Sequence, residues 1–308
     1  LVKPLQDWFD GHARVLPWRD DPKAYKVWIS EIMLQQTRVE AVKPYFARFM
    51  EALPDVEALA ACPEDRYLKL WEGLGYYNRV RNLHAAAEQI MEQYGGTIPD
   101  TVEELLRLKG IGSYTAGAIA SIAYNRPVPA VDGNVLRVIM RVTADDSDIM
   151  KQSVKSRVEK ELLAVIPKDA AGAFNQALME LGATVCLPNG EPHCAQCPWE
   201  SFCEARKQGI WQTLPVKSRA KPRRIEEKTV LIIRDGERIV LHKRGAKGLL
   251  AGLYEFPNLA GHLSEEEVLS YVREQDLVPV HIEKLEDAKH IFSHIEWHMT
   301  GYMVRVSE

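Results

Sequence analysis

Leu108-Lys109-Gly110-Ile111-Gly112, followed by Ser113-Tyr114-Thr115-Ala116-Gly117-Ala118, is the stretch that decides how this chain folds. Two glycines, Gly110 and Gly112, flank one apolar residue, and a helix of small residues begins directly after them. Glycine lets the backbone turn tightly, so the first amide groups of that helix stay free at its positive end and attract phosphate. A turn between two packed helices explains the glycine pair equally well. The longer pattern Leu-x-Gly-Ile-Gly is more specific, because it matches the helix-hairpin-helix motif of DNA-binding proteins.

Length and composition are those of a globular protein with two domains. The chain has 308 residues, of which 46% are hydrophobic and 27% charged, and this excludes disordered, collagen-like and coiled-coil chains. The net charge of −4 does not by itself indicate nucleic-acid binding, so a DNA-binding surface must be local. No apolar run is long enough for a membrane span, and early charges exclude a signal peptide. Because no initiating Met is present, we expect the natural chain to extend further.

Three regions differ in their sequence pattern. Residues 1–212 carry apolar side chains at helical spacing, as at Phe46 and Phe49, and predict a mostly α-helical region. Residues 213–225 are basic and contain proline, which predicts an interdomain linker. Such a linker is either a solvated tether or a strap that lies on phosphates. Residues 226–308 carry strand signals and predict a smaller α+β domain.

Local patterns place the elements of that α+β domain. Residues 229–233 are β-branched and apolar, and an Asp-Gly turn follows them. Ser264 and Glu267 have the spacing of a capping box, which predicts that a helix begins there. Alternation further along predicts a half-buried strand. Its expected buried residues are Ile295, Trp297 and Met299.

Four of the five cysteines lie within one short stretch, with the spacing Cys-x7-Cys-x2-Cys-x5-Cys. Four thiolates in one compact loop suit a tetrahedral zinc ion or a [4Fe–4S] cluster, and the spacing does not separate the two. Such a group of thiols indicates metal ligation in a reducing compartment, so we expect a cytoplasmic protein. The expected role of the metal is to hold the loop. The four ligands are Cys186, Cys194, Cys197 and Cys203.

Two carboxylates occupy unusual places. On a helix Glu31 shares a face with Val27 and Leu34, where loss of solvation favours the protonated form and makes it a proton donor. A Glu at the rim of that face, with its carboxylate in water, is the plainer interpretation. Asp132 precedes an apolar helical run and suits a helix cap. One neutral and one charged carboxylate are also the equipment for breaking a glycosidic bond.

These residues together resemble a known family. The chain is similar to the MutY family, adenine-specific members of the helix-hairpin-helix superfamily of DNA glycosylases, and the resemblance covers both proposed domains. The matching segments are residues 16–19 (Leu-Pro-Trp-Arg), 30–37 (Ser-Glu-Ile-Met-Leu-Gln-Gln-Thr), 71–77 (Trp-Glu-Gly-Leu-Gly-Tyr-Tyr), the hairpin and helix up to 119, 131–135 (Val-Asp-Gly-Asn-Val), the four cysteines and 292–294 (Phe-Ser-His).

The resemblance implies a fold and ligands. It implies a six-helix barrel over about residues 18–124, an iron–sulfur domain from about 1–17 plus 125–212, and a Nudix-like domain over 226–308. The substrate would be duplex DNA in which adenine is mispaired with 8-oxoguanine or guanine, and the adenine must leave the stack to be cut. The implied cofactor is a [4Fe–4S] cluster, with zinc the second choice, and a monovalent or calcium ion is expected at the hairpin. No membrane partner is expected, and the protein would be a monomer.

The resemblance also assigns roles to single residues. Glu31 would be the acid that protonates adenine N7. Asp132 would stabilise the oxocarbenium ion and bond to the sugar carbon in a hydrolysis that retains configuration. Tyr114 and Asn134 would line this site and orient Asp132. The implied DNA-binding residues are Trp18 and Arg19 in the adenine pocket, Leu34, Gln36, Thr37 and Tyr76 around the opposite base, Gly110 and Gly112 on the phosphates, and Phe292, Ser293 and His294 on 8-oxoguanine.

Three features depart from the family pattern. The first two cysteines are separated by seven residues instead of the usual six, and we expect the extra residue to bulge outward. No Arg-Glu-x-x-Glu-Glu run follows Gly248, so the Nudix-like domain should bind its ligand without hydrolysing it. The chain also ends soon after Arg305, so we expect the last element of that domain to be missing.

Other functions fit part of the pattern. A glycosylase/lyase of the endonuclease III type needs a Lys amine for a Schiff base, and this chain has Tyr114 at that place. A thymine-mismatch glycosylase is compatible with the hairpin, but the Glu31 segment and the C-terminal domain argue against it. A non-catalytic iron–sulfur protein that binds DNA would need only the hairpin and the cysteines, and the two carboxylates would then be coincidental.

Overall fold

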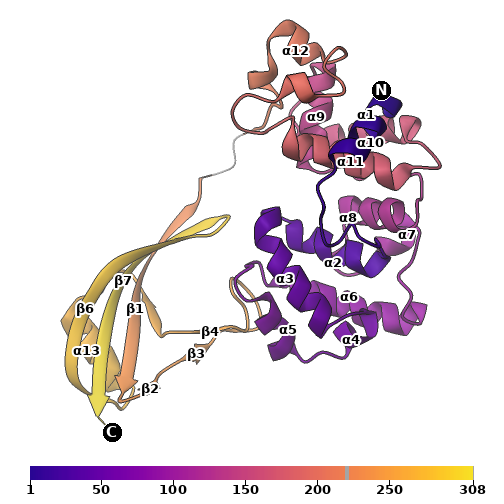
Figure 1. Cartoon of the computed structure of the whole chain (residues 1–308). Coiled ribbons are helices and arrows are strands. Elements are labelled where there is room, and N and C mark those ends of the chain that lie inside the picture. Colours follow the sequence, from indigo (N-terminus) through magenta and orange to yellow (C-terminus); the bar gives the residue numbers. More distant parts are fainter. Residues whose placement is uncertain (219–221, 308) are drawn as a thin grey trace. The chain divides into compact units, whose positions relative to one another are not determined.

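The computed structural model describes residues 1–218 and 222–307, which fall into two compact units. Residues 1–218 form a helical unit, and most of the remaining chain forms a β-rich unit (Figure 1). None of the helices in the described residues combines the length and the apolar character that a membrane span needs. Each unit has hydrophobic cores of its own, so the two are described separately.

The first half of the helical unit encloses one large aromatic core. Trp28, Phe49 and Trp71 are fully buried in it, and the rings of Phe49 and Trp71 meet edge to face at 6.0 Å. Spacing of apolar residues explains the packing, since Phe46 and Phe49 lie on one helix face. The elements are α2 (Ala24–Leu34), α3 (Val39–Ala52), α4 (Val56–Ala60), α5 (Glu64–Trp71), α6 (Asn78–Tyr94), α7 (Val102–Leu105), α8 (Ser113–Ala118) and the π-helix η1 (Ile119–Ala123).

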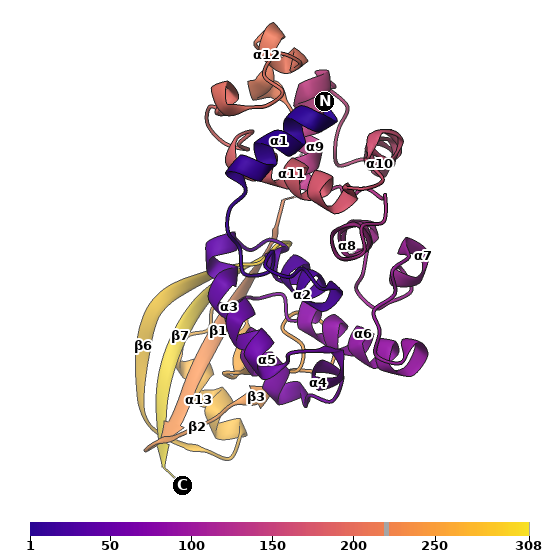
Figure 2. The same cartoon turned by 45° about the vertical axis from the view of Figure 1, so that its right-hand side comes forward.

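A second core joins the start of the chain to the second half of the helical unit. The first helix contributes Leu5 and Trp8, which pack with Phe174 and Leu181. Figure 2 shows this first helix beside α9 and α11. The elements are α1 (Val2–His12), α9 (Gly133–Thr143), α10 (Gln152–Val165), α11 (Ala171–Thr184), the 3-10 helices η2 (Cys194–Gln196) and η3 (Trp211–Thr213), and α12 (Glu204–Gln208).

The two cores meet where α11 packs against η1, and small residues allow the close approach. A Cβ on Gly117 would lie 2.1 Å from the carbonyl oxygen of Pro129, which a real side chain cannot occupy. Asn175 is fully buried at the same junction, where its amide donates to Ser121 Oγ at 2.8 Å and to the carbonyl of Val128 at 2.9 Å. These contacts fix the segment that crosses from one core to the other and leads to Asp132.

The β-rich unit is a mixed sheet covered by one helix. Strand β1 pairs parallel with β7, and β7 pairs antiparallel with β6. Both halves of the predicted capping box are present at the start of the helix, so that prediction is confirmed. The elements are β1 (Arg224–Asp235), β2 (Arg238–Ile239), β5 (Asn258–Ala260), β6 (Val278–Ile291), β7 (Ile295–Ser307), the separate hairpin β3 (His242–Lys243) and β4 (Tyr254–Glu255), and α13 (Glu265–Glu274).

The buried face of β7 corrects the predicted alternation. Ile295 is buried, but Trp297 and Met299 are only half-buried. The opposite face of the strand is the buried one. From residue 300 onward its even-numbered residues, Tyr302 among them, are buried, and they pack in the core that the strand forms with α13. Apolar residues at 295, 297 and 299 therefore misled the prediction, because their face instead carries an aromatic and cationic cluster described below.

The linker between the units is shorter than the predicted 213–225. Leu214 is buried, and the amide of Ser218 donates to Asp148 Oδ1 at 3.1 Å, so this stretch packs on the helical unit. At the other end Arg224 already begins β1. Residues 219–221 of the predicted linker lie outside the described residues.

We expect Gly117→Ala to lower the free energy of unfolding of the helical unit by roughly 2–3 kcal/mol, because the added methyl group must push the Pro129 carbonyl aside. Thermal unfolding followed by circular dichroism measures this. Gly11→Ala is the matched control, since nothing lies within 4 Å of a Cβ added there. Equal melting temperatures for the two variants would contradict the close packing described for the junction.

Candidate active site

Glu31 is a buried carboxyl group on α2. Its residue is only 8% exposed, and its neighbours on the helix face are buried Val27 and half-buried Leu34. Burial raises the pKa of Glu31 to about 7, and the nearby Asp132 adds to the increase. A hydrogen bond from Tyr114 and the positive charge of Arg19 oppose it. Near neutral pH a large fraction of Glu31 is therefore an uncharged acid, which can donate a proton.

Tyr114 connects the hairpin to this acid. It lies in the first turn of α8, and its hydroxyl donates to Glu31 Oε2. The Tyr114 hydroxyl oxygen also lies 3.7 Å from the sulfur of Met179 on α11. Burial and the adjacent carboxylates of Glu31 and Asp132 raise the pKa of the phenol far above its usual range, so Tyr114 stays protonated and acts as a donor.

Asp132 is the N-cap of α9, as its sequence context predicts. Its Oδ1 accepts from the amide of Val135 at 2.8 Å, and its Oδ2 accepts from Asn134 Nδ2 at 2.8 Å. Burial raises the pKa of Asp132, while these two hydrogen bonds stabilise the carboxylate and oppose the increase. Because the charge of Asp132 acts on both Glu31 and Tyr114, the three side chains form one site.

Asn134 is held in turn by Arg137, one turn further along α9. Arg137 Nη2 donates to Asn134 Oδ1 at 2.9 Å and to the carbonyl of Gly182 at 2.7 Å. Its Nε donates to the carbonyl of Cys186 at 2.8 Å. A continuous run of hydrogen bonds thus joins Asp132 to the backbone of the first predicted metal ligand.

Arg19 lies close enough to act on Glu31 and is fixed by a buried acid. Its Nη2 donates to Glu180 Oε2 at 2.8 Å, and Arg14 Nε donates to Glu180 Oε1 at 2.7 Å. Burial alone would raise the pKa of Glu180, but the hydrogen bonds from the two arginines outweigh it and lower the pKa to about 2. Trp18 is buried and packs edge to face on Phe46 at 5.4 Å, so its ring belongs to the first core.

The residues predicted to contact DNA lie on the surface of the helical unit. Gln36 and Tyr76 are exposed and have positive φ angles of 58° and 47°, an uncommon conformation for side chains of this kind. Leu34 and Thr37 are half-buried beside Gln36. Leu34 is the last residue of α2, whereas Gln36 and Thr37 lie in the loop that follows α2, and Tyr76 lies in the loop that follows α5.

The hairpin has the open helix start that the glycines predict. Gly110 has φ of +75°, and a Cβ there would lie 2.6 Å from Asn82 Cβ, so both its conformation and its space require glycine. Gly112 is exposed, and no side chain caps the helix that follows it. The first amides of this helix are therefore left without a side-chain partner, and such amides bind phosphate oxygens in other proteins.

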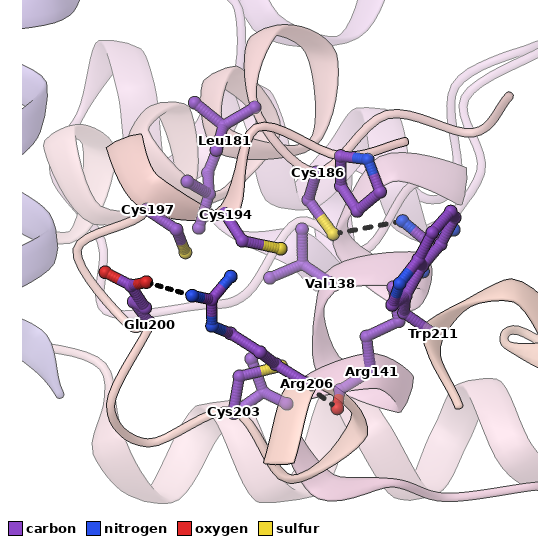
Figure 3. A pocket seen from close by; sticks show the side chains of 13 residues that line it. Val138, Arg141, Leu181, Cys186, Cys194, Cys197, Glu200, Cys203, Arg206 and Trp211 are labelled. Atoms are coloured by element: carbon purple, nitrogen blue, oxygen red, sulfur yellow. Dashed lines mark hydrogen bonds and ion pairs between the residues drawn. The ribbon is translucent and has the colours of Figure 1, made fainter. Parts of the chain in front are cut away.

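The four clustered cysteines line one pocket, and Figure 3 shows their sulfurs directed toward the same interior space. Arg141 Nη1 donates to Cys186 Sγ at 3.4 Å, and the amide of Trp199 donates to Cys197 Sγ at 3.4 Å. The remaining wall is partly apolar, with Val138 and Leu181. Sulfur-directed donors and an apolar wall are the surroundings that iron–sulfur clusters have in proteins.

The longer spacing between the first two cysteines is absorbed by an exposed loop. Residues 188–191 are exposed, and the amide of His193 returns to the carbonyl of Val185 at 2.9 Å. This bond closes the base of the loop, so the extra residue extends outward while Cys186 and Cys194 still line the same pocket.

Phe292, Ser293 and His294 form the turn between β6 and β7 in the β-rich unit. Ser293 and His294 are exposed, while the Phe292 ring packs edge to face on Trp297 at 4.8 Å. Lys228 lies over the Trp297 ring, with its Nζ 4.8 Å from the ring centroid. The turn is therefore supported by packed aromatic rings and one lysine ammonium group.

Comparison with known proteins identifies the family. A model of the HhH-GPD superfamily of base excision DNA repair proteins matches residues 29–168, and a NUDIX domain model matches residues 229–308. The adenine DNA glycosylase of Homo sapiens is 36% identical over 95% of this chain and 64% of its own length. That of Buchnera aphidicola subsp. Acyrthosiphon pisum is 32% identical over 97% of this chain and 85% of its own length. This chain belongs to the adenine DNA glycosylase family.

Solved structures of other DNA glycosylases share the fold of the helical region. A thermostable thymine-DNA glycosylase is 25% identical, with a TM-score of 0.59 over 67% of this chain and 95% of its own. Endonuclease III in a non-covalent complex with DNA is also 25% identical, with a TM-score of 0.56 over 67% of this chain and 94% of its own. The predicted fold class, a helix-hairpin-helix glycosylase followed by a smaller Nudix-like α+β domain, is confirmed.

Sequence reasoning missed the arginines and the acid that support the site. Arg137 could have been found, because it stands three residues after Asn134 on the same predicted helix face. Glu180 and Arg79 bond to residues far away in the sequence, and no local pattern marks those contacts. Cys62, the one cysteine outside the cluster, is a buried residue of the first core.

Proposed function

We propose that this chain removes adenine from duplex DNA in which the base is mispaired with 8-oxoguanine or guanine. One observation carries the proposal: Glu31, with a pKa near 7, shares a buried site with Asp132, and Tyr114 donates to Glu31. The family relation supports the choice of adenine. The chain spans 64% of the length of the human relative.

The proposed reaction begins with proton transfer. Adenine leaves the base stack and enters the site, where neutral Glu31 donates its proton to N7 of the purine. The C1′–N9 bond then breaks, its electron pair leaves with the protonated base, and positive charge develops on the sugar. Asp132, held as an anion by Asn134 and the amide of Val135, faces that charge and stabilises it.

Hydrolysis completes the proposed reaction with retained configuration. The Asp132 carboxylate bonds to C1′ on the face opposite the departed base, and water then displaces it, giving its proton to Glu31. Tyr114 keeps its proton and orients Glu31 throughout. A phenol cannot form an imine with the sugar, so no Schiff base and no strand cleavage through one are expected.

The remaining site residues are assigned to DNA recognition. Gln36 and Tyr76, together with Leu34 and Thr37, would contact the bases around the adenine and its partner. The free amides after Gly112 would hold a backbone phosphate, and the monovalent or calcium ion expected at the hairpin stays a prediction. In the β-rich unit Phe292, Ser293 and His294 would recognise 8-oxoguanine, without hydrolysis of a nucleotide.

The four cysteines would hold a [4Fe–4S] cluster. Four sulfurs bound to one zinc ion would each lie about 2.3 Å from it. The donors directed at two of the sulfurs and the partly apolar wall of the pocket support the cluster, and zinc stays the second choice. Such a cluster would cross-link the end of α11 to the start of α12.

Base release tests the assignment of the two carboxyl groups. We expect Glu31→Gln and Asp132→Asn each to slow single-turnover adenine release from an adenine:8-oxoguanine duplex by roughly 100-fold or more, since each removes a separate part of one step. The control is Glu40→Gln, which alters an exposed acid on the next helix. Faster release from thymine:guanine or thymine-glycol duplexes by the unaltered protein would contradict the choice of adenine.

Removal of the Tyr114 hydroxyl should shift the pH dependence of release. The rate falls as pH rises through the pKa of Glu31, about 7, because the acid loses its proton. Since the Tyr114 hydrogen bond lowers that pKa, Tyr114→Phe moves the alkaline limb of the profile to higher pH. Tyr124→Phe, which removes a hydroxyl bonded to the carbonyl of Ile98, should leave the limb in place. An alkaline limb that stays in place or moves to lower pH in Tyr114→Phe would exclude this coupling between Tyr114 and Glu31.

Metal analysis tests the cysteine site. The protein purified without oxygen should contain iron and sulfide and show the broad visible absorption of an iron–sulfur cluster. Cys194→Ser should lose most of both, whereas Cys62→Ser, at the buried isolated cysteine, should keep them. A colourless protein that contains zinc would replace this assignment with a zinc site.

A further inference from the structure

Arg79, in the first turn of α6, bonds to five backbone carbonyls from two separate segments. Its Nη1 donates to the carbonyls that end α2, and its Nη2 donates to two carbonyls in the loop before α6. The acceptors are Ile32 at 2.8 Å, Met33 at 3.1 Å, Gln35 at 2.7 Å, Leu74 at 3.1 Å and Gly75 at 3.3 Å.

These bonds replace a conventional helix cap. The last carbonyls of an α-helix have no hydrogen-bond donor within the helix. At the end of α2 the Arg79 guanidinium donates to them and adds a favourable positive charge. Burial lowers the pKa of Arg79 to about 10, so it stays charged near neutral pH. Its guanidinium also lies over the Trp71 ring, 5.3 Å from the centroid, which fixes its plane.

Each bonded segment leads directly into an exposed residue with positive φ. The carbonyl of Gln35 precedes Gln36, and the carbonyl of Gly75 precedes Tyr76. The Tyr76 ring also contacts the guanidinium, at 5.6 Å from its centroid, although Tyr76 is 51% exposed. Uncommon backbone conformations persist only where surrounding contacts hold them, and here one side chain holds both.

The same helix supports the hairpin. Asn82, one turn beyond Arg79, lies directly beneath Gly110, and Gln89 accepts from the amide of Lys109 at 2.8 Å. Gln35, Arg79, Asn82 and Lys109 line one small pocket between these segments. Helix α6 is thus a common base for three surface segments that are far apart in the sequence.

We propose that Arg79 is a positioning residue that fixes the separation of Gln36 and Tyr76, so that both side chains enter the DNA duplex as one unit and displace the adenine. The inference rests on the function proposed above. The two Nη groups of the planar guanidinium reach the two groups of carbonyls separately, whereas a Lys ammonium has three donors at one point and cannot reach both. The hydrogen bonds of Arg79 go to backbone carbonyls and not to the carboxyl groups of Glu31 or Asp132, so we expect its main effect on base extrusion.

The experiment compares Arg79→Lys with the unaltered full chain carrying its metal. Adenine release is measured at saturating protein on two duplexes, one with adenine opposite 8-oxoguanine and one with adenine opposite an abasic-site analogue, where no partner base resists extrusion. A third duplex carries fluorescent 2-aminopurine in place of adenine and reports unstacking directly. Arg81→Lys is the matched control, because Arg81 is a half-buried arginine on the same helix whose Nε pairs with the exposed side chain of Glu64 at 2.9 Å.

The positioning role predicts a selective loss. Arg79→Lys should slow release opposite 8-oxoguanine at least tenfold more than release opposite the abasic analogue, and it should reduce the rise in 2-aminopurine fluorescence. Equal slowing on both duplexes with a full fluorescence rise, or no slowing at all, would overturn the inference. If the unaltered protein itself releases no adenine, the proposed function fails and not this inference alone.

A second measurement does not depend on how Arg79→Lys folds. Gln36→Ala and Tyr76→Ala alter exposed side chains, and their effects on release should be strongly non-additive if the two act as one unit. A double variant that loses little more than the worse single variant supports the inference. Losses that multiply in full would show that the two side chains act independently, and would overturn it.

Discussion

The structure depends on the burial of one carboxyl group between two hydrophobic cores. Glu31 lies on a helix of the first core, Tyr114 follows the hairpin, and Asp132 caps helix α9 of the second core, so their site exists only while the cores remain joined. The junction is accordingly rigid. Asn175 is fully hydrogen-bonded within it, glycines allow backbone contact, and the buried Glu180 ties Arg14 and Arg19 to α11. A charge at Glu31 is disfavoured for the same reason that the cores are stable, namely the exclusion of water.

Tyr114 leaves the start of the hairpin helix without an amine nucleophile. A Lys at the start of the hairpin helix would place a nucleophile beside the sugar, whereas a phenol with a pKa far above neutrality can only donate or orient a proton. The helical scaffold is shared with a thymine-DNA glycosylase and with endonuclease III, at TM-scores of 0.59 and 0.56, so the fold alone does not decide which reaction takes place.

Local sequence patterns predicted the features that depend only on residues close together in the chain. Helical spacing located Phe46 and Phe49, the capping box located the start of α13, and the context of Asp132 predicted its cap. Glu31 was found because a carboxylate on an apolar face is unusual. The supporting contacts could not be predicted, since Arg79 reaches residues 44 to 47 positions away and Arg14 reaches one 166 positions away. The alternation in β7 failed for a related reason, because only the packing of α13 decides which face of that strand is buried.

The cap formed by Asp132 has one more consequence. Both of its oxygens are already engaged, one by the amide of Val135 and one by Asn134, so the side chain has a single rotamer before any DNA arrives. The conformational entropy of that side chain is lost once, when the chain folds, and is not lost again each time a sugar cation forms beside it. A glutamate at this position would add a rotatable bond and could not keep both partners, although its charge and acidity would be almost the same.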